Sequence, residues 1–292
     1  MELRVLQYFL AVTREQSISG AAESLHLSQP TLSRQLKDME EELGKQLLIR
    51  GNRRITLTEE GMILRKRAEE IMELVQKAEH EIATSDEYIA GDITVGAGET
   101  DGVRFLARTT KALQQDYPDI HLHIISGDGE DVEENLDRGL IDFGFLCREF
   151  DTSKYEYLKV PSGDSIGVLM RRDSPLAEKE ILAPEDLLDK PLIVSRQMLR
   201  NTEVGKLLVC NQDRLNIVGT YNLLYNGSLM VDEGMGYALC FDKIIYTDGN
   251  CSLCFRPLIP TLNVPHYVIW KKYQTFAKAA EKFLLKMQEL AV

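Results

Sequence analysis

The chain has 292 residues, enough for two or three domains, and its 44% hydrophobic and 27% charged content is ordinary for a globular protein. No run reaches the roughly 18 uncharged apolar residues of a membrane span, so we expect no membrane partner. The net charge of −12 argues against binding of nucleic acid by the surface as a whole. Whether the chain can bind nucleic acid therefore depends on where its basic residues lie.

The expected compartment follows from the N-terminus and the cysteines. A helical pattern starts at once, without the layout of a signal peptide. An odd number of cysteines is spread over a large chain, which is not a disulfide framework and fits a reducing compartment. We therefore expect a cytoplasmic protein. The histidines show no metal-ligand spacing on a helix, and we predict no metal and no cofactor.

Three short helices are predicted at the start of the chain. Apolar spacing of i, i+3, i+4 and i+7 predicts a first helix over residues 2–15, with Leu3, Leu6, Phe9, Leu10 and Thr13 on one face. Ser17 or Ser19 can cap a second helix. Ser28 is a good N-cap for a third, where Pro30 occupies the first turn and its missing N–H costs nothing.

The third helix separates its charges along its length. Its buried stripe is predicted to be Leu32, Leu36, Met39 and Leu43. No acid lies between Ser24 and Lys37, whereas Asp38 and three glutamates follow directly. A helix that enters the major groove with its N-terminal half meets phosphates and base edges there, and carboxylates in that half would be repelled. The distribution indicates a helix that contacts DNA.

A hairpin with an arginine-rich tip is predicted next, because short apolar runs at residues 47–49 and 55–57 flank a Gly-Asn turn. Such a tip can bind phosphate or enter a minor groove. Residues 1–58 are thus predicted to form a winged helix-turn-helix domain that binds double-stranded DNA; the alternative is a helical domain with ordinary solvated charges. The expected DNA contacts are Gln29, Pro30, Thr31, Ser33, Arg34, Lys37, Arg50, Arg53 and Arg54.

A long helix is predicted over residues 59–90, about 45 Å in length. Thr58 can cap it, and two glutamates in its first turn suit the helix dipole. Steps of four and three residues alternate along a narrow heptad seam, which indicates pairing with a second copy in a homodimer. The alternative is a core helix of the second domain. The seam consists of Leu64, Ala68, Ile71, Val75, Ala78, Ile82, Ser85 and Ile89.

From residue 91 onward, strand-like runs alternate with helical ones, which predicts an α/β domain with a parallel sheet covered on both faces. In such sheets ligands bind at the carboxyl ends of the strands. Strands are predicted at 91–98, 121–126, 142–146, 165–170, 191–194, 216–221, 236–241 and 266–270, and helices at 103–117, 131–138, around 229–233 and at 276–290.

The segment "LQYFLAVTREQSISGAAESLHLSQPTLSRQLKDMEEELGKQLLIRGNRRITLTEEG" resembles the N-terminal domain of LysR-type transcriptional regulators, above all in "AAESLHLSQPTLSRQLKDMEEELG". The resemblance extends more weakly over residues 91–292. It implies two lobes like those of periplasmic binding proteins, about 91–161 with 266–292 and about 162–265, which hold a small-molecule effector between them. It also implies paired linker helices and a homotetramer built as two dimers.

The positions that match the family's effector cleft include an unusual first loop. Many members place Ser or Thr there to hold a carboxylate, whereas this loop carries Glu99 and Asp101. Acids facing the cleft would repel an anion, so we expect a cationic or zwitterionic effector, unless Arg148 and Arg196 offset them. Alternatively, both acids cap the following helix and point to solvent. The matching positions are Glu99, Thr100, Asp101, Ser126, Gly127, Cys147, Arg148, Ser195, Arg196, Gln197 and Tyr221.

Other chemistry is disfavoured. Cys251 and Cys254 form a C-x-x-C that runs from a turn into a strand, so their side chains should face opposite sides, unlike a redox or metal pair. No nucleophile-elbow, phosphate-loop or dinucleotide motif is present, and we expect no enzyme. The rival interpretations are a solute-binding protein or small-molecule enzyme with an N-terminal dimerisation domain, and a DNA-binding protein whose second domain serves only assembly.

Overall fold

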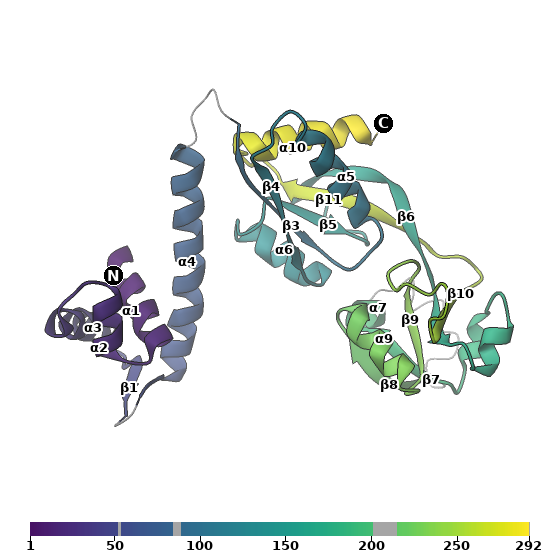
Figure 1. Ribbon diagram of the computed structural model, residues 1–292, viewed down its shortest axis with the longest axis horizontal. Helices are drawn as coiled ribbons and strands as arrows, with labels where there is room; N and C mark the ends of the chain where they lie inside the picture. The colour runs from purple at the N-terminus through teal and green to yellow at the C-terminus, as the bar shows by residue number, and fades with distance from the viewer. Residues whose placement is uncertain (52–53, 84–88, 201–214, 292) are drawn as a thin grey trace. The chain divides into compact units, whose positions relative to one another are not determined.

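The computed structural model of the 292-residue chain describes all residues except 52–53, 84–88, 201–214 and 292 (Figure 1). The chain divides into two compact units, residues 1–83 and 84–292, and each is described by itself. Among the described residues, no helix is both long and apolar enough to span a membrane.

The first unit begins with three helices, α1 (Leu3–Glu15), α2 (Ile18–Ser24) and α3 (Gln29–Leu43). Ser17 Oγ accepts from the Gly20 N–H at 3.2 Å, so Ser17 rather than Ser19 caps α2. Ser28 Oγ accepts from the Thr31 N–H at 3.3 Å and caps α3, as predicted.

The core of the first unit differs in part from the predicted faces. Leu3 and Leu43 are exposed, so their assignment to the buried stripes was wrong. Both lie at helix ends, and α1 instead turns Val5 and Val12 inward, since it packs against α2, α3 and α4 and needs a broad apolar face. The buried residues are Val5, Leu6, Phe9, Ala11, Val12, Ala21, Ala22, Leu32, Leu36, Met39, Leu47 and Leu48.

The predicted hairpin is confirmed, because β1 (Leu48–Arg50) pairs antiparallel with β2 (Ile55–Leu57). Asn52 and Arg53 at its tip lie outside the described residues. Thr58 Oγ1 then accepts from the Gly61 N–H at 3.0 Å and caps the long helix α4. A side chain at Gly61 would collide with the Leu47 carbonyl oxygen, so this glycine allows the hairpin to lie directly against α4.

Helix α4 (Glu59–Ala83) has 25 residues, about 37 Å at a helical rise of ~1.5 Å per residue, and is shorter than predicted. Ala68 is buried and Leu64 packs against the core of the first unit, whereas Ile82 is 85% exposed. Ser85 lies outside the described residues. Ile89 packs on the core of the second unit, so its place in the seam was wrong: it directly precedes a strand of that unit.

In the second unit, nine strands are found among the described residues, in the order β4-β3-β5-β11-β6-β9-β7-β8 with β10 beside β6. The expectation of a parallel sheet holds within each lobe and is wrong for the strands that join the lobes. β3 pairs in parallel with β4 and β5, and β7 pairs in parallel with β8 and β9. β6 and β11 run antiparallel to each other, β11 runs antiparallel to β5, and β6 runs antiparallel to β9. The strands are β3 (Gly91–Ala97), β4 (Ile120–Ser126), β5 (Phe143–Leu146), β6 (Tyr155–Arg171), β7 (Pro191–Ser195), β8 (Asn216–Tyr221), β9 (Tyr237–Phe241), β10 (Leu253–Pro257) and β11 (Asn263–Lys271).

Separate hydrophobic clusters give the unit two lobes, joined by β6 and β11 (Figure 1). The first lobe holds β3–β5 and the ends of β6 and β11 beside them, and the second holds β7–β10 and the other ends. Helices α5, α6 and α10 belong to the first lobe, and α7 and α9 to the second. The helices are α5 (Val103–Leu113), α6 (Gly129–Asp137), α7 (Arg196–Arg200), α9 (Leu224–Asp232) and α10 (Lys278–Leu290), with single 3-10 turns at Pro175–Glu178 and Pro184–Leu187.

Candidate functional site

The N-terminal half of α3 presents polar and basic side chains to solvent. The side chains of Arg34 and Lys37 are 82% and 69% exposed, and Gln29, Pro30 and Thr31 are exposed as well, whereas Ser33 is half-buried. The opposite side of the helix is held in the core by Leu32, Leu36 and Met39. Burial on one face therefore fixes which residues of α3 can meet a partner.

The acids that follow in α3 have two different roles. Asp38 and Glu41 form exposed i,i+4 ion pairs with Arg34 (3.9 Å) and Lys37 (3.1 Å). Exposed pairs of this kind contribute little, so phosphate can replace them. Glu40 is different, because its Oε1 accepts from the backbone N–H groups of Leu47 (2.7 Å) and Leu48 (3.0 Å). That carboxylate ties the start of the hairpin to α3, a role with no signal in the sequence.

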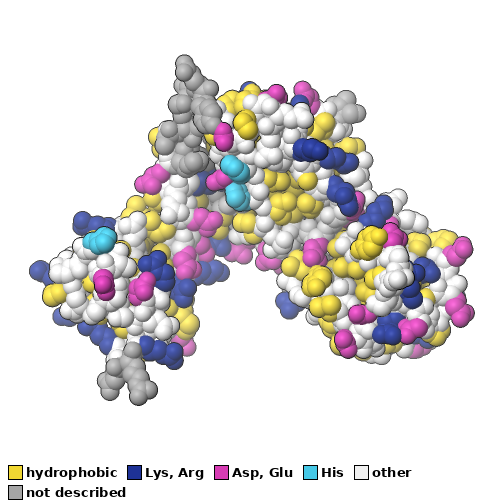
Figure 2. Space-filling model, viewed as in Figure 1, with side chains coloured by type: hydrophobic (Ala, Val, Ile, Leu, Met, Phe, Trp, Pro, Cys, Tyr) yellow, Lys and Arg dark blue, Asp and Glu magenta, His cyan; other side chains and the backbone are white. Residues whose placement is uncertain are grey.

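The hairpin adds basic side chains beside α3. Arg50 and Arg54 are exposed at either side of its tip, where the Gly51 N–H donates to the Arg54 carbonyl oxygen at 3.2 Å. Arg53, also predicted to contact DNA, lies outside the described residues. Figure 2 shows Lys and Arg side chains over the surface of this unit. The first unit thus carries an exposed basic edge that suits a polyanion.

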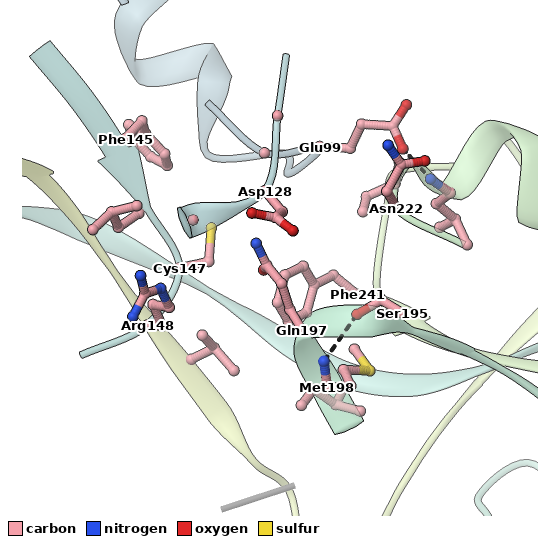
Figure 3. Close-up of a pocket in the computed structure, with 18 of the residues that line it drawn as sticks. Glu99, Asp128, Phe145, Cys147, Arg148, Ser195, Gln197, Met198, Asn222 and Phe241 are labelled. Atoms are coloured by element: carbon pink, nitrogen blue, oxygen red, sulfur yellow. Dashed lines mark hydrogen bonds between the residues drawn. The ribbon is translucent and has the colours of Figure 1, made fainter. Parts of the chain in front are cut away.

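The second unit contains a cavity of about 570 Å³ between its lobes, a typical volume for a small-molecule site (Figure 3). The carboxyl ends of β3 and β5 and the loop before α6 form one wall. The end of β7, the start of α9 and the crossing region of β11 form the rest. Both lobes therefore contribute side chains to one concave surface.

The predicted effector residues divide into two groups. Those that line the cavity are Glu99, Gly127, Cys147, Arg148, Ser195, Gln197 and Tyr221, and those that do not are Thr100, Asp101, Ser126 and Arg196. Asp101, in the turn before α5, pairs with Arg104 of that helix at 2.5 Å, while Ser126 and Arg196 are exposed elsewhere. Polar lining residues that the sequence did not single out are Asp128, Glu130, Glu149, Asn222 and Asn263.

Glu99 faces the cleft, which is the first of the two expected arrangements, and it also contacts the opposite lobe. Its carboxylate lines the cavity, yet it accepts a hydrogen bond from the backbone N–H of Leu224, the first residue of α9 in the other lobe (Figure 3). A helix N-terminus is a ready anion site, because its N–H groups are unpaired and its dipole is positive. Glu99 therefore occupies the anion site of α9 and links the two lobes.

Arg148 does not neutralise the acids of the cavity. Its Nη2 lies 2.6 Å from Glu133 Oε2, and its Nη1 donates to the Glu149 carbonyl oxygen. Glu133 is not part of the lining, so the guanidinium charge is already matched from outside. The lining includes the carboxylates of Glu99, Asp128, Glu130 and Glu149. The formal charge of the described lining residues is consequently negative.

Two lining groups are held in their neutral forms. Burial, and then the nearby Asp164, raises the pKa of the Cys147 thiol to about 12. Burial, followed by Cys240 and Glu99, raises the pKa of Tyr221 well above its usual range, and its hydroxyl donates to the Leu239 carbonyl oxygen at 2.5 Å. Neither group adds charge to the cavity at neutral pH.

The C-x-x-C cysteines face different cores, as predicted. Cys254 is buried in the core that contains Leu192 and Leu258, whereas Cys251 packs against the core around Tyr221 and Leu224. Both are free thiols. Forming a bridge would require β10 to lose its register with β6, since Cys254 is paired there with Met170.

We accordingly expect DNA binding to be insensitive to dithiothreitol, and Cys251→Ser to leave DNA affinity unchanged within about twofold, because Cys251 is a half-buried residue of the second unit and not one of the predicted DNA contacts. The measurement is fluorescence anisotropy on a fixed duplex with and without reductant. A large loss of affinity on reduction would contradict this assignment of the two cysteines.

Comparison with known proteins agrees with this architecture. Residues 3–62 match the model described as "Bacterial regulatory helix-turn-helix protein, lysR family", and residues 86–291 match "LysR substrate binding domain". The chain is 32% identical to the transcriptional regulator CysL of Bacillus subtilis, with 84% of this chain and 82% of CysL covered. It is 28% identical to the Hca operon transcriptional activator HcaR of Escherichia coli, with 99% and 98% covered.

Solved structures show the same fold. The LysR family transcriptional regulator CbnR superimposes with a TM-score of 0.76 at 20% identity, with 100% of each chain covered. Full-length CbnR in complex with its target DNA gives a TM-score of 0.77 at 21% identity, again with 100% of each chain covered.

Proposed function

The chain belongs to the LysR family of DNA-binding transcriptional regulators, and on that premise we propose that α3 and the hairpin contact double-stranded DNA in a cytoplasmic homodimer whose cleft binds a positively charged effector. The effector-binding domain and the regulator function follow from the family; the contacts, the assembly and the effector class are proposed here. The observation that carries the proposal is the exposure of Arg34 and Lys37 on a half-helix without acids.

The proposed DNA contacts follow from the geometry of the first unit. The first turn of α3 is exposed and free of acids, which suits contact with base edges in a major groove. Arg50 and Arg54 lie beside the hairpin tip and suit phosphate oxygens. Glu40 holds the hairpin to α3, so both elements meet one duplex with a fixed spacing.

The proposed homodimer rests on α4. In the second half of the predicted seam, Ile71 and Val75 are only partly buried and Ala78 and Ile82 are exposed, and a seam of this kind is buried when two helices pair. A two-fold pair of first units would bind two half-sites, so the DNA site should be roughly palindromic. A homotetramer built from two such dimers remains the expectation for the whole assembly.

The proposed effector carries a positive charge. Among the described residues, four acids line the cavity, and the guanidinium that lines it, that of Arg148, is paired with Glu133. Glu99 already occupies the N-terminus of α9, where an effector carboxylate would otherwise bind. A ligand with an amino group can pair with Asp128, which lines the cavity, without displacing either contact.

Thermal-shift measurements on the full chain test the effector class. We expect small amines or amino acids, and not dicarboxylates, to raise the melting temperature, because a ligand that binds only the folded state stabilises it by mass action. The same ligand should change the affinity for a selected duplex. Stabilisation by dicarboxylates alone would contradict the proposal.

Glu99→Ala should expose the anion site at the start of α9. We expect the second unit to lose about 1 kcal/mol, the usual effect of removing a helix cap, and to become stabilised by acetate or succinate. Differential scanning calorimetry with and without these anions measures both effects. Asp101→Ala is the matched control, since that acid of the same loop pairs with Arg104 outside the cavity. An equal response of the two variants would contradict the role of Glu99.

A further inference from the structure

Four polar side chains meet beside the cleft, at the place where β6 and β11 cross from one lobe to the other. Thr100 follows β3 and Cys147 follows β5, while Asp164 lies in β6 and His266 lies in β11 at the irregularity between Pro265 and Tyr267. The side chains of His266 and Asp164 are 1% and 5% exposed. Segments far apart in sequence thus bring a thiol, a carboxylate and an imidazole to one buried point.

The donor atoms of this cluster are close enough to share one ion. His266 Nε2 lies 3.0 Å from Asp164 Oδ2, and the ligand atoms of Cys147, Asp164 and His266 all lie within 4.8 Å of one another. Thr100 Oγ1 lies 3.2 Å from His266 Nε2. In a tetrahedral zinc site with bonds of about 2.0–2.3 Å, ligand atoms lie about 3.3–3.7 Å apart. Small side-chain rotations would reach that spacing.

We propose that Cys147 Sγ, Asp164 Oδ2 and His266 Nε2 bind Zn²⁺ or a similar borderline divalent transition metal. A mixed sulfur, nitrogen and oxygen set selects such ions over Mg²⁺ and Ca²⁺, which prefer oxygen alone. Three protein ligands would leave a fourth position for water or another small ligand. The thiol would bind as the thiolate and release its proton to solvent.

The surroundings of His266 fit a ligand role. Its Nδ1 lies 3.1 Å from Ser162 Oγ, which orients the ring and leaves Nε2 toward Asp164. Metal-binding histidines commonly have such an outer partner on the other ring nitrogen. Gly102 packs so closely on the imidazole that any side chain there would collide with it, and the ring is held in place.

Access and charge also fit. Cys147 lines the cavity between the lobes, so an ion can enter from the cleft. Within the described ranges, the ion pair of Asp164 is with His266, and no Lys or Arg pairs with it. A divalent cation would compensate the buried carboxylate of Asp164 together with the thiolate that forms when Cys147 binds the ion.

The alternative is a hydrogen-bonded cluster without metal. Thr100 donates to Asp164 at 2.5 Å, and His266 lies within reach of both. That arrangement needs Thr100, Asp164 and His266, and it has no requirement for the sulfur of Cys147. A metal site requires that sulfur, so Cys147 distinguishes the two possibilities.

The test is a Co²⁺ titration of the purified, chelator-treated full chain, followed by absorbance. We expect one equivalent of Co²⁺ per chain, a thiolate-to-cobalt charge-transfer band and displacement by Zn²⁺. Cys147→Ser should abolish the band, and Cys251→Ser, another half-buried free thiol, should keep it. Ser162→Ala should weaken binding about 10- to 100-fold, as expected for loss of an outer partner.

Absence of a saturable charge-transfer band in the wild-type chain would overturn the proposal, and so would a band that persists in Cys147→Ser. Circular dichroism of each variant confirms folding. His266→Gln is the second ligand variant and should also lose the band; should it unfold, the half-buried Cys147 still decides the outcome. The result does not depend on which effector or DNA site the chain binds.

Discussion

Replacing Arg34 and Lys37 together with glutamate should weaken binding to duplex DNA by on the order of 100-fold or more. Each side chain is exposed on the acid-free half of α3, so the change reverses two charges where phosphates and base edges would lie. The fold should be unaffected, since neither side chain contributes to the core. Fluorescence anisotropy on a duplex selected by the wild-type chain, at one fixed salt concentration, measures the loss.

The matched control is the double change Arg108→Glu and Lys111→Glu. Both residues are exposed on α5 of the second unit, and the variant has the same net charge as the first. We expect its DNA affinity to stay within a few-fold of wild type. Similar losses in the two variants would mean that net charge, and not the surface of α3, governs binding.

Replacing Phe9 with alanine should destabilise the first unit by about 3–5 kcal/mol, the usual cost of deleting a buried aromatic side chain. Phe9 is fully buried in a core that α1 shares with α2, α3 and the hairpin. The free energy of unfolding of a unit of this size is typically only about 5–10 kcal/mol, so the variant should unfold and lose DNA binding at moderate temperature. In calorimetry, the transition of residues 1–83 should move, and the transition of residues 84–292 should stay.

Leu3→Ala on the same helix is the control for this change. Leu3 is exposed at the start of α1, so its loss should alter stability by less than about 1 kcal/mol. An equal effect of the two substitutions would contradict the assignment of the core. It would favour the face that the apolar spacing of α1 first suggested.

Features set by neighbouring residues could be predicted from the sequence. Ser17, Ser28 and Thr58 cap α2, α3 and α4, because an N-cap hydrogen bond joins a side chain to a backbone group two or three residues ahead. The hairpin follows from its Gly-Asn turn and two short apolar runs. The family resemblance supplied the two-lobed architecture, which such local signals do not define.

Features that depend on distant contacts could not be predicted. β6 begins ten residues before the predicted strand. The alternation of helices and strands along the sequence does not predict its antiparallel pairing with β11. Glu99 caps a helix 125 residues further along the chain, and Asp164 meets Thr100 and His266 across both lobes. Nothing near these residues in sequence marks their partners.

The cavity shows the same limit at the level of single residues. Glu99, Arg148 and Gln197 line it at positions that matched the family cleft, whereas Thr100 belongs to the neighbouring cluster with Asp164. Glu99 and Thr100 are neighbours in one loop, yet only the first of them lines the cavity. Matching positions along a chain therefore finds the right loop more readily than the right residue.

The salt dependence of DNA affinity tests most directly whether an acidic chain binds the polyanion through one segregated basic edge. With roughly six to eight phosphate contacts from two first units, log affinity should fall linearly with log salt, and the affinity should drop about 10³–10⁴-fold between about 50 and 200 mM. Anisotropy titrations of the full chain over that range measure the slope. A slope near zero would mean that Arg34, Lys37, Arg50 and Arg54 do not meet phosphate, and would contradict the account.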